Sequence, residues 1–263
     1  MELQNHKAEF DANGIKLFAI SYDSIDSLAS FADHYSVNYP LLSDLDSRVI
    51  REFGILNTQI QPDETKYYGI PYPGTYLVNE SGTVVAKFFN RQYQVRETAP
   101  SMLRMGFNLP LNPAGLSHAE VGGAGVTVHA SLMANELHPQ QRSFIYVALE
   151  MDKGLHVYGD PLPDGYVSTE VHATGAEGLE FGKPQFPPTK PFKIEGIEDE
   201  FHTFEGKIEI VIPIISTIRE AGTTTIDLTV GFQACSSEMC YLPRIEKLCL
   251  ELTTGPNVDS RER

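Results

Sequence analysis

Apolar and polar residues alternate along the second half of the chain. The alternation is clearest in residues 224–232, where Ile226, Leu228, Val230 and Phe232 are apolar, and in residues 247–252, where Leu248, Leu250 and Leu252 are apolar. A period of two predicts half-buried β-strands. Three further runs alternate in the same way: Val126, Val128 and Ala130; Phe144, Tyr146 and Ala148; and Ile208, Ile210 and Ile212. Proline-rich turns separate these runs, so residues 117–255 are predicted to form an antiparallel β-sandwich.

The first 107 residues mix helical and strand-like patterns. Helices are predicted around Leu3 and Phe10, then around Ile25, Leu28, Phe31 and Ala32 after a cap at Asp23 or Ser24, then around Val49, Ile50 and Phe53 after a cap at Asp44, and finally at residues 96–105. Strands are predicted at residues 15–21, 74–78 and 83–89. This order predicts an α/β domain at residues 1–107.

Between the two patterned regions, residues 108–116 contain two prolines and predict an extended linker. Residues 256–263 predict a frayed tail. A length of 263 residues fits the two domains so defined.

Composition excludes several classes of function. The net charge is -15, with no basic patch, which argues against nucleic-acid binding. No apolar run approaches the roughly 20 residues of a membrane span. The first residues carry no signal-peptide pattern, and no phosphate-binding glycine motif is present, so neither an export signal nor a cofactor is predicted.

Two of the three cysteines, Cys235 and Cys240, lie at the turn between the two clearest strands. A turn could bring them within disulfide distance, whereas Cys249 alternates with the inward leucines and is expected on the opposite face. The pair could be a redox-active dithiol, a structural disulfide or half of a metal site. Zinc needs four ligands, and the sequence shows no second Cys/His cluster, so no metal is predicted. Residue chemistry leaves the redox and structural interpretations equally favoured.

Residues 233–243, which read QACSSEMCYLP, and residues 154–166, which read GLHVYGDPLPDGY, resemble two motifs of the N-terminal domain of DsbD-type thiol-disulfide interchange proteins. The resemblance implies an immunoglobulin-like sandwich in an extracytoplasmic location, with Cys235 and Cys240 passing electrons to a thioredoxin-like protein or domain. Phe232 replaces the family's usual tyrosine, and Arg244 follows Pro243 where the family has a second proline.

Four other side chains are candidates to support the pair. His156 could orient or tune the thiols, although a lone histidine is more often structural. Tyr158, Tyr166 and Phe232 could shield the disulfide, and packing in a sandwich core explains them nearly as well.

Residues 19–24, 39–44 and 69–78 are similar to segments of the AhpC/TSA (peroxiredoxin or redoxin) branch of the thioredoxin superfamily. The resemblance implies a thioredoxin-like α/β domain with a cis-proline at Pro73. That family's reactive cysteine ends a strand that precedes the first helix, and here no cysteine precedes Cys235. We therefore expect an N-terminally incomplete domain without peroxidase activity.

Two functions are consistent with these observations. The first is a thiol-disulfide oxidoreductase that uses Cys235 and Cys240. The second is a non-catalytic adaptor, in which the disulfide is structural and the degenerate redoxin domain only docks.

Overall fold

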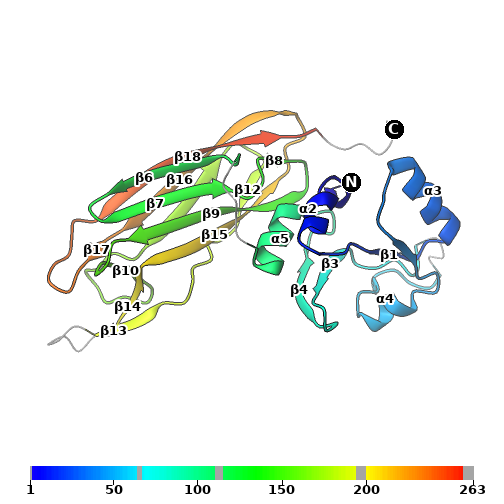
Figure 1. Cartoon of the computed structure of the whole chain (residues 1–263), viewed down its shortest axis with the longest axis horizontal. Coiled ribbons are helices and arrows are strands. Elements are labelled where there is room, and N and C mark those ends of the chain that lie inside the picture. Colours follow the sequence, from blue (N-terminus) through cyan, green and yellow to red (C-terminus); the bar gives the residue numbers. More distant parts are fainter. Residues whose placement is uncertain (1, 64–66, 110–114, 194–199, 257–263) are drawn as a thin grey trace. The chain divides into compact units, whose positions relative to one another are not determined.

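The computed structural model describes residues 2–63, 67–109, 115–193 and 200–256, and it divides into two compact units, Met1–Leu109 and Pro110–Arg263 (Figure 1). Most of the expected linker, residues 110–114, and the expected tail from residue 257 onward lie outside the described residues. The extended linker and the frayed tail therefore stay predictions. No helix in the described part of the chain is long and apolar enough to cross a bilayer.

The N-terminal unit is α/β, as expected. Its elements are α1 (Glu2–Asn5), α2 (Lys7–Ala12), β1 (Ala19–Ser21), α3 (Ile25–Tyr35), β2 (Leu41–Ser43), α4 (Arg48–Glu52), β3 (Gly74–Val78), β4 (Val84–Phe89), β5 (Arg96–Glu97) and α5 (Ala99–Phe107). Strands β1 and β2 pair in parallel, and β3 and β4 form an antiparallel hairpin. These two pairs are separate sheets in the described structure.

Helix α3 has its N-cap at Ser24, one of the two residues predicted, whereas the N-cap of α4 is Ser47 and not the predicted Asp44. Ser24 Oγ accepts the Ser27 backbone N–H at 3.2 Å at the start of α3. Asp44 acts on α4 from further upstream, because its carboxylate accepts the backbone N–H groups of Val49 and Ile50 at 3.2 and 2.8 Å. Burial raises the pKa of Asp44, but these backbone hydrogen bonds outweigh burial and leave the pKa lowered.

Other expectations for this unit were wrong. The strand expected at residues 15–21 covers only Ala19–Ser21, where β2 supplies a hydrogen-bonding partner. The last helix begins at Ala99 rather than at residue 96, because Pro100 favours the first turn of a helix and Thr98 occupies the N-cap. Pro73 does not follow a cis peptide bond; the cis bond found in the described residues joins Asp160 and Pro161.

The apolar face expected on α3 is not buried. Ile25 is 75% exposed and Phe31 is 48% exposed, and no residue of this helix is buried. The buried cluster of this unit lies elsewhere, where Phe10, Ala99 and Leu103 pack together. An amphipathic sequence identifies an apolar face, but burial also requires a surface for that face to contact.

The C-terminal unit is all β. Its strands are β6 (His118–Gly123), β7 (Val126–Leu132), β8 (Glu136–Leu137), β9 (Gln141–Met151), β10 (His156–Gly159), β11 (Glu170–Gly175), β12 (Leu179–Phe181), β13 (Lys190–Lys193), β14 (Glu200–Glu205), β15 (Lys207–Ser216), β16 (Gly222–Phe232), β17 (Ala234–Cys235) and β18 (Arg244–Thr254). They form three sheets in the orders β12-β15-β9-β7-β6, β11-β16-β18-β8 and β13-β14-β10-β17. The pairs are antiparallel except for β8 with β18.

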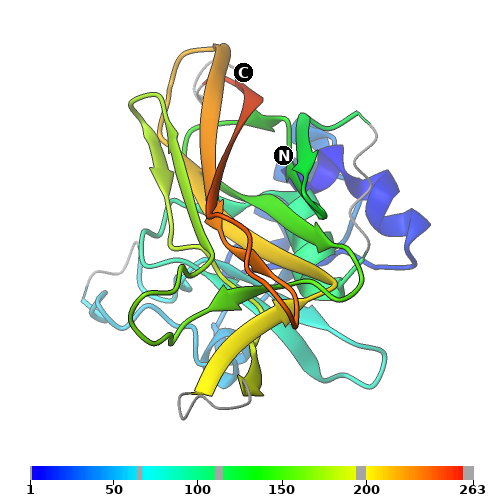
Figure 2. The ribbon, with the colours of Figure 1, turned by 90° about the vertical axis from the view of Figure 1, so that its left-hand side faces the viewer.

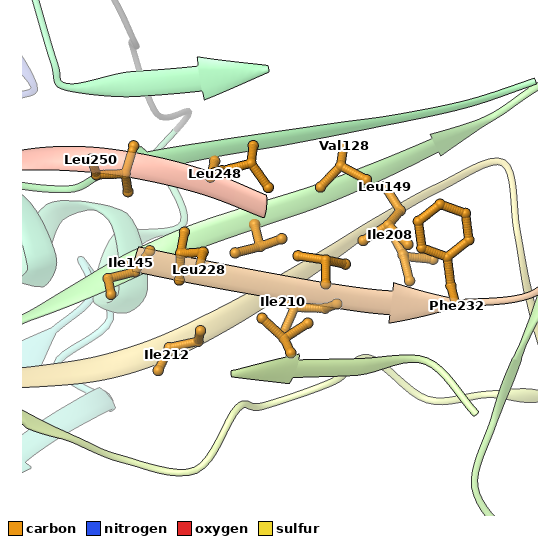
Figure 3. Close-up of a cluster of buried hydrophobic side chains, with 14 of the residues drawn as sticks. Val128, Ile145, Leu149, Ile208, Ile210, Ile212, Leu228, Phe232, Leu248 and Leu250 are labelled. Carbon is orange, nitrogen blue, oxygen red and sulfur yellow. The ribbon is translucent and has the colours of Figure 1, made fainter. Parts of the chain in front are cut away.

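The first two sheets enclose one hydrophobic core, which confirms the sandwich. Alternate residues of β7, β15, β16 and β18 enter the core as predicted (Figure 3). The phase of β9 differs: Ile145, Val147 and Leu149 belong to the core, whereas the expected Phe144 and Ala148 are buried outside it. Apolar residues occupy both faces of β9, so alternation could not identify the core side.

The third sheet carries the cysteine pair. In Figure 2 the end of the unit with β14 (yellow) faces the viewer. A second, smaller apolar cluster lies here and consists of Tyr158, Phe201 and Cys235. The disulfide therefore has its own aromatic surroundings, separate from the main core.

Candidate functional site

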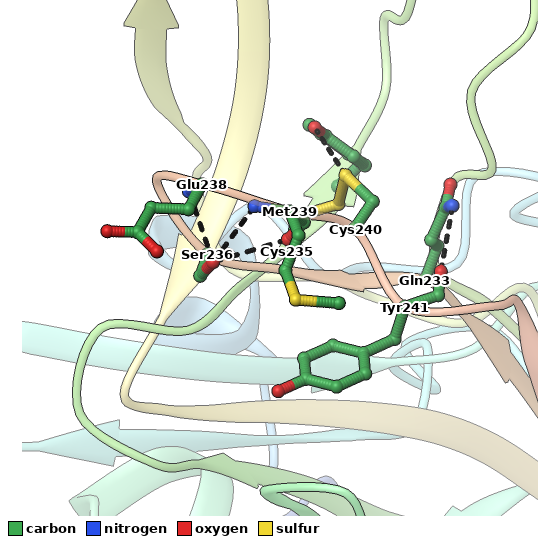
Figure 4. The surroundings of a disulfide bond; sticks show 8 residues. Gln233, Cys235, Ser236, Glu238, Met239, Cys240 and Tyr241 are labelled. Atoms are coloured by element: carbon green, nitrogen blue, oxygen red, sulfur yellow. Dashed lines mark hydrogen bonds between the residues drawn. A yellow bond between two sulfur atoms is a disulfide. The ribbon is translucent and has the colours of Figure 1, made fainter.

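Cys235 and Cys240 form a disulfide, with sulfur atoms 2.04 Å apart and Cα atoms 4.0 Å apart (Figure 4). Cys235 ends β17, and Cys240 faces it in an isolated antiparallel bridge. Outside the disulfide, the Tyr241 N–H donates to the Ala234 carbonyl at 2.9 Å, and Gln233 Nε2 donates to the Tyr241 carbonyl at 3.0 Å. Hydrogen bonds thus align the two arms of the loop independently of the sulfur–sulfur bond.

Ser236 organises the tip of this loop. Its Oγ accepts the backbone N–H groups of Glu238 and Met239 at 3.2 and 3.1 Å. Its own N–H donates to the Met239 carbonyl at 2.8 Å. The serine hydroxyl thus supplies hydrogen bonds to backbone N–H groups that have no strand partner at the tip of the loop. The Glu238 side chain is exposed, as expected for a solvated turn carboxylate.

The two sulfur-bearing residues differ in exposure. Cys235 is 1% exposed and packs with Tyr158 and Phe201, whereas Cys240 is exposed. The Tyr158 hydroxyl lies 3.8 Å from Cys240 Sγ. Burial, followed by the influence of Tyr166, raises the pKa of Tyr158, so its hydroxyl keeps its proton near neutral pH. Of the two cysteines, Cys240 is therefore the one that solvent and other molecules can approach.

His156 lies directly opposite Cys235 in the antiparallel pairing of β10 with β17. The residue is 6% exposed, and its ring lies 5.3 Å from the Tyr158 ring and 4.9 Å from the Phe192 ring. Burial lowers the pKa of His156, and the Glu205 carboxylate partly opposes that effect. Its Nε2 atom is buried and has no hydrogen-bond partner within the described structure.

An open pocket of about 390 Å³ adjoins the disulfide. Its lining combines aromatic rings, the loop and one cationic side chain: His156, Tyr158, Phe192, Lys193, and residues 236–240. Cys240 thus borders a hollow that can receive a side chain or a short peptide segment. The described residues include no group of three or more side chains suited to hold a metal ion.

The structure brings together some of the candidate residues and separates others. Cys235, Cys240, His156 and Tyr158 meet at the third sheet. Phe232 instead belongs to the main sandwich core, where the Arg244 guanidinium lies 5.2 Å from its ring centre. Pro73 belongs to the N-terminal unit.

Cys249 is exposed on the outer face of its sheet, opposite Asp227 in the register of β16 and β18. Partial desolvation and the Asp227 carboxylate raise the pKa of its thiol. A raised pKa reduces the thiolate fraction, so Cys249 is a poor nucleophile at neutral pH. The structure confirms that it stands apart from the pair.

Sequence reasoning did not identify Phe192 and Phe201, which contact the site from β13 and β14. The two residues are paired across those strands. Phe192 contacts His156, and Phe201 contacts Tyr158 at 5.7 Å between ring centres. Phe192 follows Pro191, but no spacing in the sequence connects either phenylalanine to the cysteines.

Comparisons with known proteins confirm both resemblances. Residues 1–87 match the sequence model of the AhpC/TSA family, and residues 128–251 match that of the N-terminal region of thiol:disulfide interchange protein DsbD. A Haemophilus influenzae protein named as a peroxiredoxin, bcp, is 36% identical over 90 residues, which cover 33% of this chain and 54% of that protein. A protein of Mycobacterium tuberculosis, also named as a peroxiredoxin, is 30% identical over 101 residues, covering 37% of this chain and 58% of its own length. The chain spans about half the length of the curated relatives it matches.

Solved structures similar to this chain include N-terminal domains of the proteins ScsB and DsbD. The N-terminal periplasmic domain of ScsB from Proteus mirabilis aligns with a TM-score of 0.38 at 15% identity, covering 51% of this chain and 52% of that one. The complex between the DsbD and PilB N-terminal domains from Neisseria meningitidis aligns with a TM-score of 0.31 at 15% identity, covering 40% and 73%. The two sequence-family matches thus associate the units with redoxin and thiol-disulfide interchange families.

Proposed function

We propose that this protein is a thiol-disulfide oxidoreductase in which Cys235 and Cys240 exchange electrons with a thioredoxin-like protein or domain. The observation that carries the proposal is the pairing of an exposed cysteine with a buried one at the edge of a pocket. A purely structural disulfide needs neither the pocket nor an accessible sulfur atom. The match of residues 128–251 to a thiol-disulfide interchange family supports the same chemistry.

The difference in exposure supports a different role for each cysteine. During oxidation of the pair, the Cys240 thiolate attacks a disulfide of the partner and forms a mixed disulfide, releasing one partner thiolate. The Cys235 thiolate then attacks Cys240 Sγ, closes the internal disulfide and releases the second partner thiolate. Two electrons pass to the partner, and the reverse sequence reduces the internal disulfide.

The surroundings of Cys240 fit a protein partner. Met239 is 56% exposed and Leu242 is 86% exposed, and they flank Cys240 on either side along the chain. Exposed apolar side chains around a reactive sulfur favour docking of an apolar surface that carries its own cysteine pair. All three cysteines of the sequence lie in the C-terminal unit, so the proposed chemistry is assigned to that unit. We further propose an extracytoplasmic location, where such partners and disulfides coexist.

The alternative is an adaptor with a structural disulfide. The short loop weighs against it, because a disulfide that closes a loop of sequence separation 5 stabilises a fold less than one that closes a long loop. The adaptor requires the disulfide to persist under reducing conditions, whereas the oxidoreductase requires it to exchange.

The reduction potential of the pair distinguishes the two functions. We would equilibrate the full chain carrying Cys249→Ser with glutathione and dithiothreitol buffers. A potential between about -270 and -120 mV supports exchange, whereas a value below about -300 mV indicates an inert structural bond and contradicts the proposal. Trapping tests the assigned roles: with thioredoxin as the probe, Cys235→Ser should accumulate a mixed disulfide through Cys240, and the matched variant Cys240→Ser should not.

A further inference from the structure

We propose that His156 accepts the proton of the Cys235 thiol through Nε2 as Cys235 resolves the mixed disulfide on Cys240. This inference rests on the proposed thiol-disulfide exchange and adds to it a residue that moves the proton. The exposed Cys240 can lose its proton to solvent. The buried Cys235 cannot, so the reaction needs an acceptor inside the protein.

The first argument is the position of His156. His156 on β10 pairs directly with Cys235 on the neighbouring antiparallel strand β17. Side chains of directly opposed residues in an antiparallel pair lie on the same face, with Cβ atoms about 4.5–5.5 Å apart. Both residues are almost fully buried, and His156 lines the pocket that Cys240 borders. The imidazole and the two cysteines thus meet at one site, where His156 and Cys235 are buried and Cys240 borders the open pocket.

The second argument is the unpartnered ring nitrogen. Leaving a buried polar atom without a hydrogen bond destabilises the folded state, so such an atom in a native structure requires an explanation. His156 Nε2 is such an atom in the disulfide form. A disulfide has no hydrogen to donate, but reduction creates an S–H donor on Cys235. The missing hydrogen bond is therefore explained if Nε2 receives its partner only when the cysteines are reduced.

The charges around His156 favour a neutral imidazole before the transfer. Burial lowers its pKa, and Glu205, registered opposite it on β14, raises it. Lys193 from β13 and Glu238 from the loop also line the pocket. Tyr158, on the same strand, is not an alternative base, because burial raises its pKa and its hydroxyl stays protonated. A neutral imidazole protonated on Nδ1 leaves Nε2 free to accept a proton.

The step balances as follows. The Cys235 S–H proton passes to His156 Nε2, and the Cys235 electron pair forms the bond to Cys240 Sγ. The bond between Cys240 and the partner sulfur breaks, and the partner leaves as a thiolate carrying two electrons. The imidazolium then returns its proton to the departing thiolate or to solvent. In the reverse direction, the imidazolium protonates Cys235 as that residue leaves.

The test separates the reactions of the two cysteines with a small reagent. We would mix the reduced full chain carrying Cys249→Ser with 5,5′-dithiobis(2-nitrobenzoate). Attack by Cys240 releases one coloured thiolate, and resolution by Cys235 releases the second. In His156→Phe, which keeps an aromatic ring beside Phe192, the first release should be unchanged and the second should slow at least about tenfold at pH 7.

The pH profile excludes a purely structural effect. The second release in the unsubstituted protein should level off above the imidazole pKa. In His156→Phe the second release should keep rising with pH toward the thiol pKa, which is about 8.5 for a free cysteine. His156→Gln, which can hydrogen-bond but cannot take the proton, should behave like His156→Phe. The matched control His172→Phe, at an exposed histidine on β11, should behave like the unsubstituted protein.

Two results would overturn the proposal: an unchanged second release in His156→Phe, or equal slowing of both releases at every pH. The second would mean that the histidine only shapes the site. These results are independent of the proposed function, because the reagent reads the reduced cysteines whatever their reduction potential. A potential outside the exchange window would reject the oxidoreductase and leave the proton-transfer measurement to be judged by itself.

Discussion

Helix α3 of the N-terminal unit and strand β16 of the C-terminal unit both have one apolar face, but only β16 buries it. Ile226, Leu228 and Val230 of β16 are almost fully buried in the sandwich core. Ile25 and Phe31 of α3 are exposed. Sequence periodicity identifies the apolar face equally well in the two cases. What differs is the presence of a facing surface, which β16 finds in the opposite sheet.

The difference extends to backbone pairing. Strand β16 has a neighbour on each side, β11 and β18, so its hydrogen-bonding groups are largely satisfied within the sheet. In the N-terminal unit, β1 pairs with β2 and β3 pairs with β4, as two separate pairs in the described structure. A two-stranded pair is marginal without further packing. We therefore expect substitutions in the sandwich core to cost much more than comparable substitutions on α3.

The largest effect should follow from Leu250→Ala in β18. Leu250 is almost fully buried in the core, and removing its side chain should lower the free energy of unfolding of this unit by about 2–5 kcal/mol. Denaturant unfolding of the full chain, followed by hydrogen exchange at β16 and β18, would measure the loss. A loss below about 1 kcal/mol would contradict the account of this core as tightly packed.

A smaller effect should appear in how the stability of each unit depends on pH. The pKa of His156 is lowered in the folded state, so the unfolded chain binds the proton more readily as pH falls. The C-terminal unit should therefore lose stability as pH falls through about 6.5, the unfolded value, toward the lower folded value. The lowered pKa of Asp44 affects the N-terminal unit at lower pH, because stability is lost as pH falls through about 3.9, the unfolded value, toward the lower folded value.

Hydrogen exchange in both units between pH 7.5 and 5.5 would check this prediction. His156→Phe should remove the pH dependence of the C-terminal unit, and His172→Phe should keep it. If the loss persists without His156, another group is responsible.

The sequence predicted the sandwich well because its strands are regular and have one apolar face. Residues 224–232 and 247–252 became β16 and β18 with the expected inward residues. The prediction failed for strands that lack a single apolar face or a pairing partner. β9 is apolar on both faces, so Phe144 and Ala148 were placed on the wrong side. The strand expected at residues 15–21 shortened to three residues, because apolar composition does not by itself supply a pairing partner.

The sequence likewise predicted some residues of the candidate site and missed others. The cysteine pair, His156 and Tyr158 were found from two motifs, and the structure places these residues together. Phe192 and Phe201 were missed, because the pairing of β13 with β14 brings them to the site. Phe232 adjoins the cysteine loop in sequence, but strand alternation turns its side chain into the main core. Proximity in sequence is therefore a weak guide to which side chains surround a disulfide.

The smallest effects, on two neighbouring residues of α3, give the sharpest test of the comparison. Ser24→Ala removes the side chain that accepts the Ser27 N–H, and it should destabilise α3 by about 1 kcal/mol. Ile25→Ala, one residue later, removes a side chain that is 75% exposed, and it should change stability by less than about 0.5 kcal/mol. Local hydrogen exchange along α3 in the full chain would measure both changes, each variant serving as the control for the other. If Ile25→Ala costs more than Ser24→Ala, the apolar face of α3 is covered in solution, and the contrast between α3 and β16 is wrong.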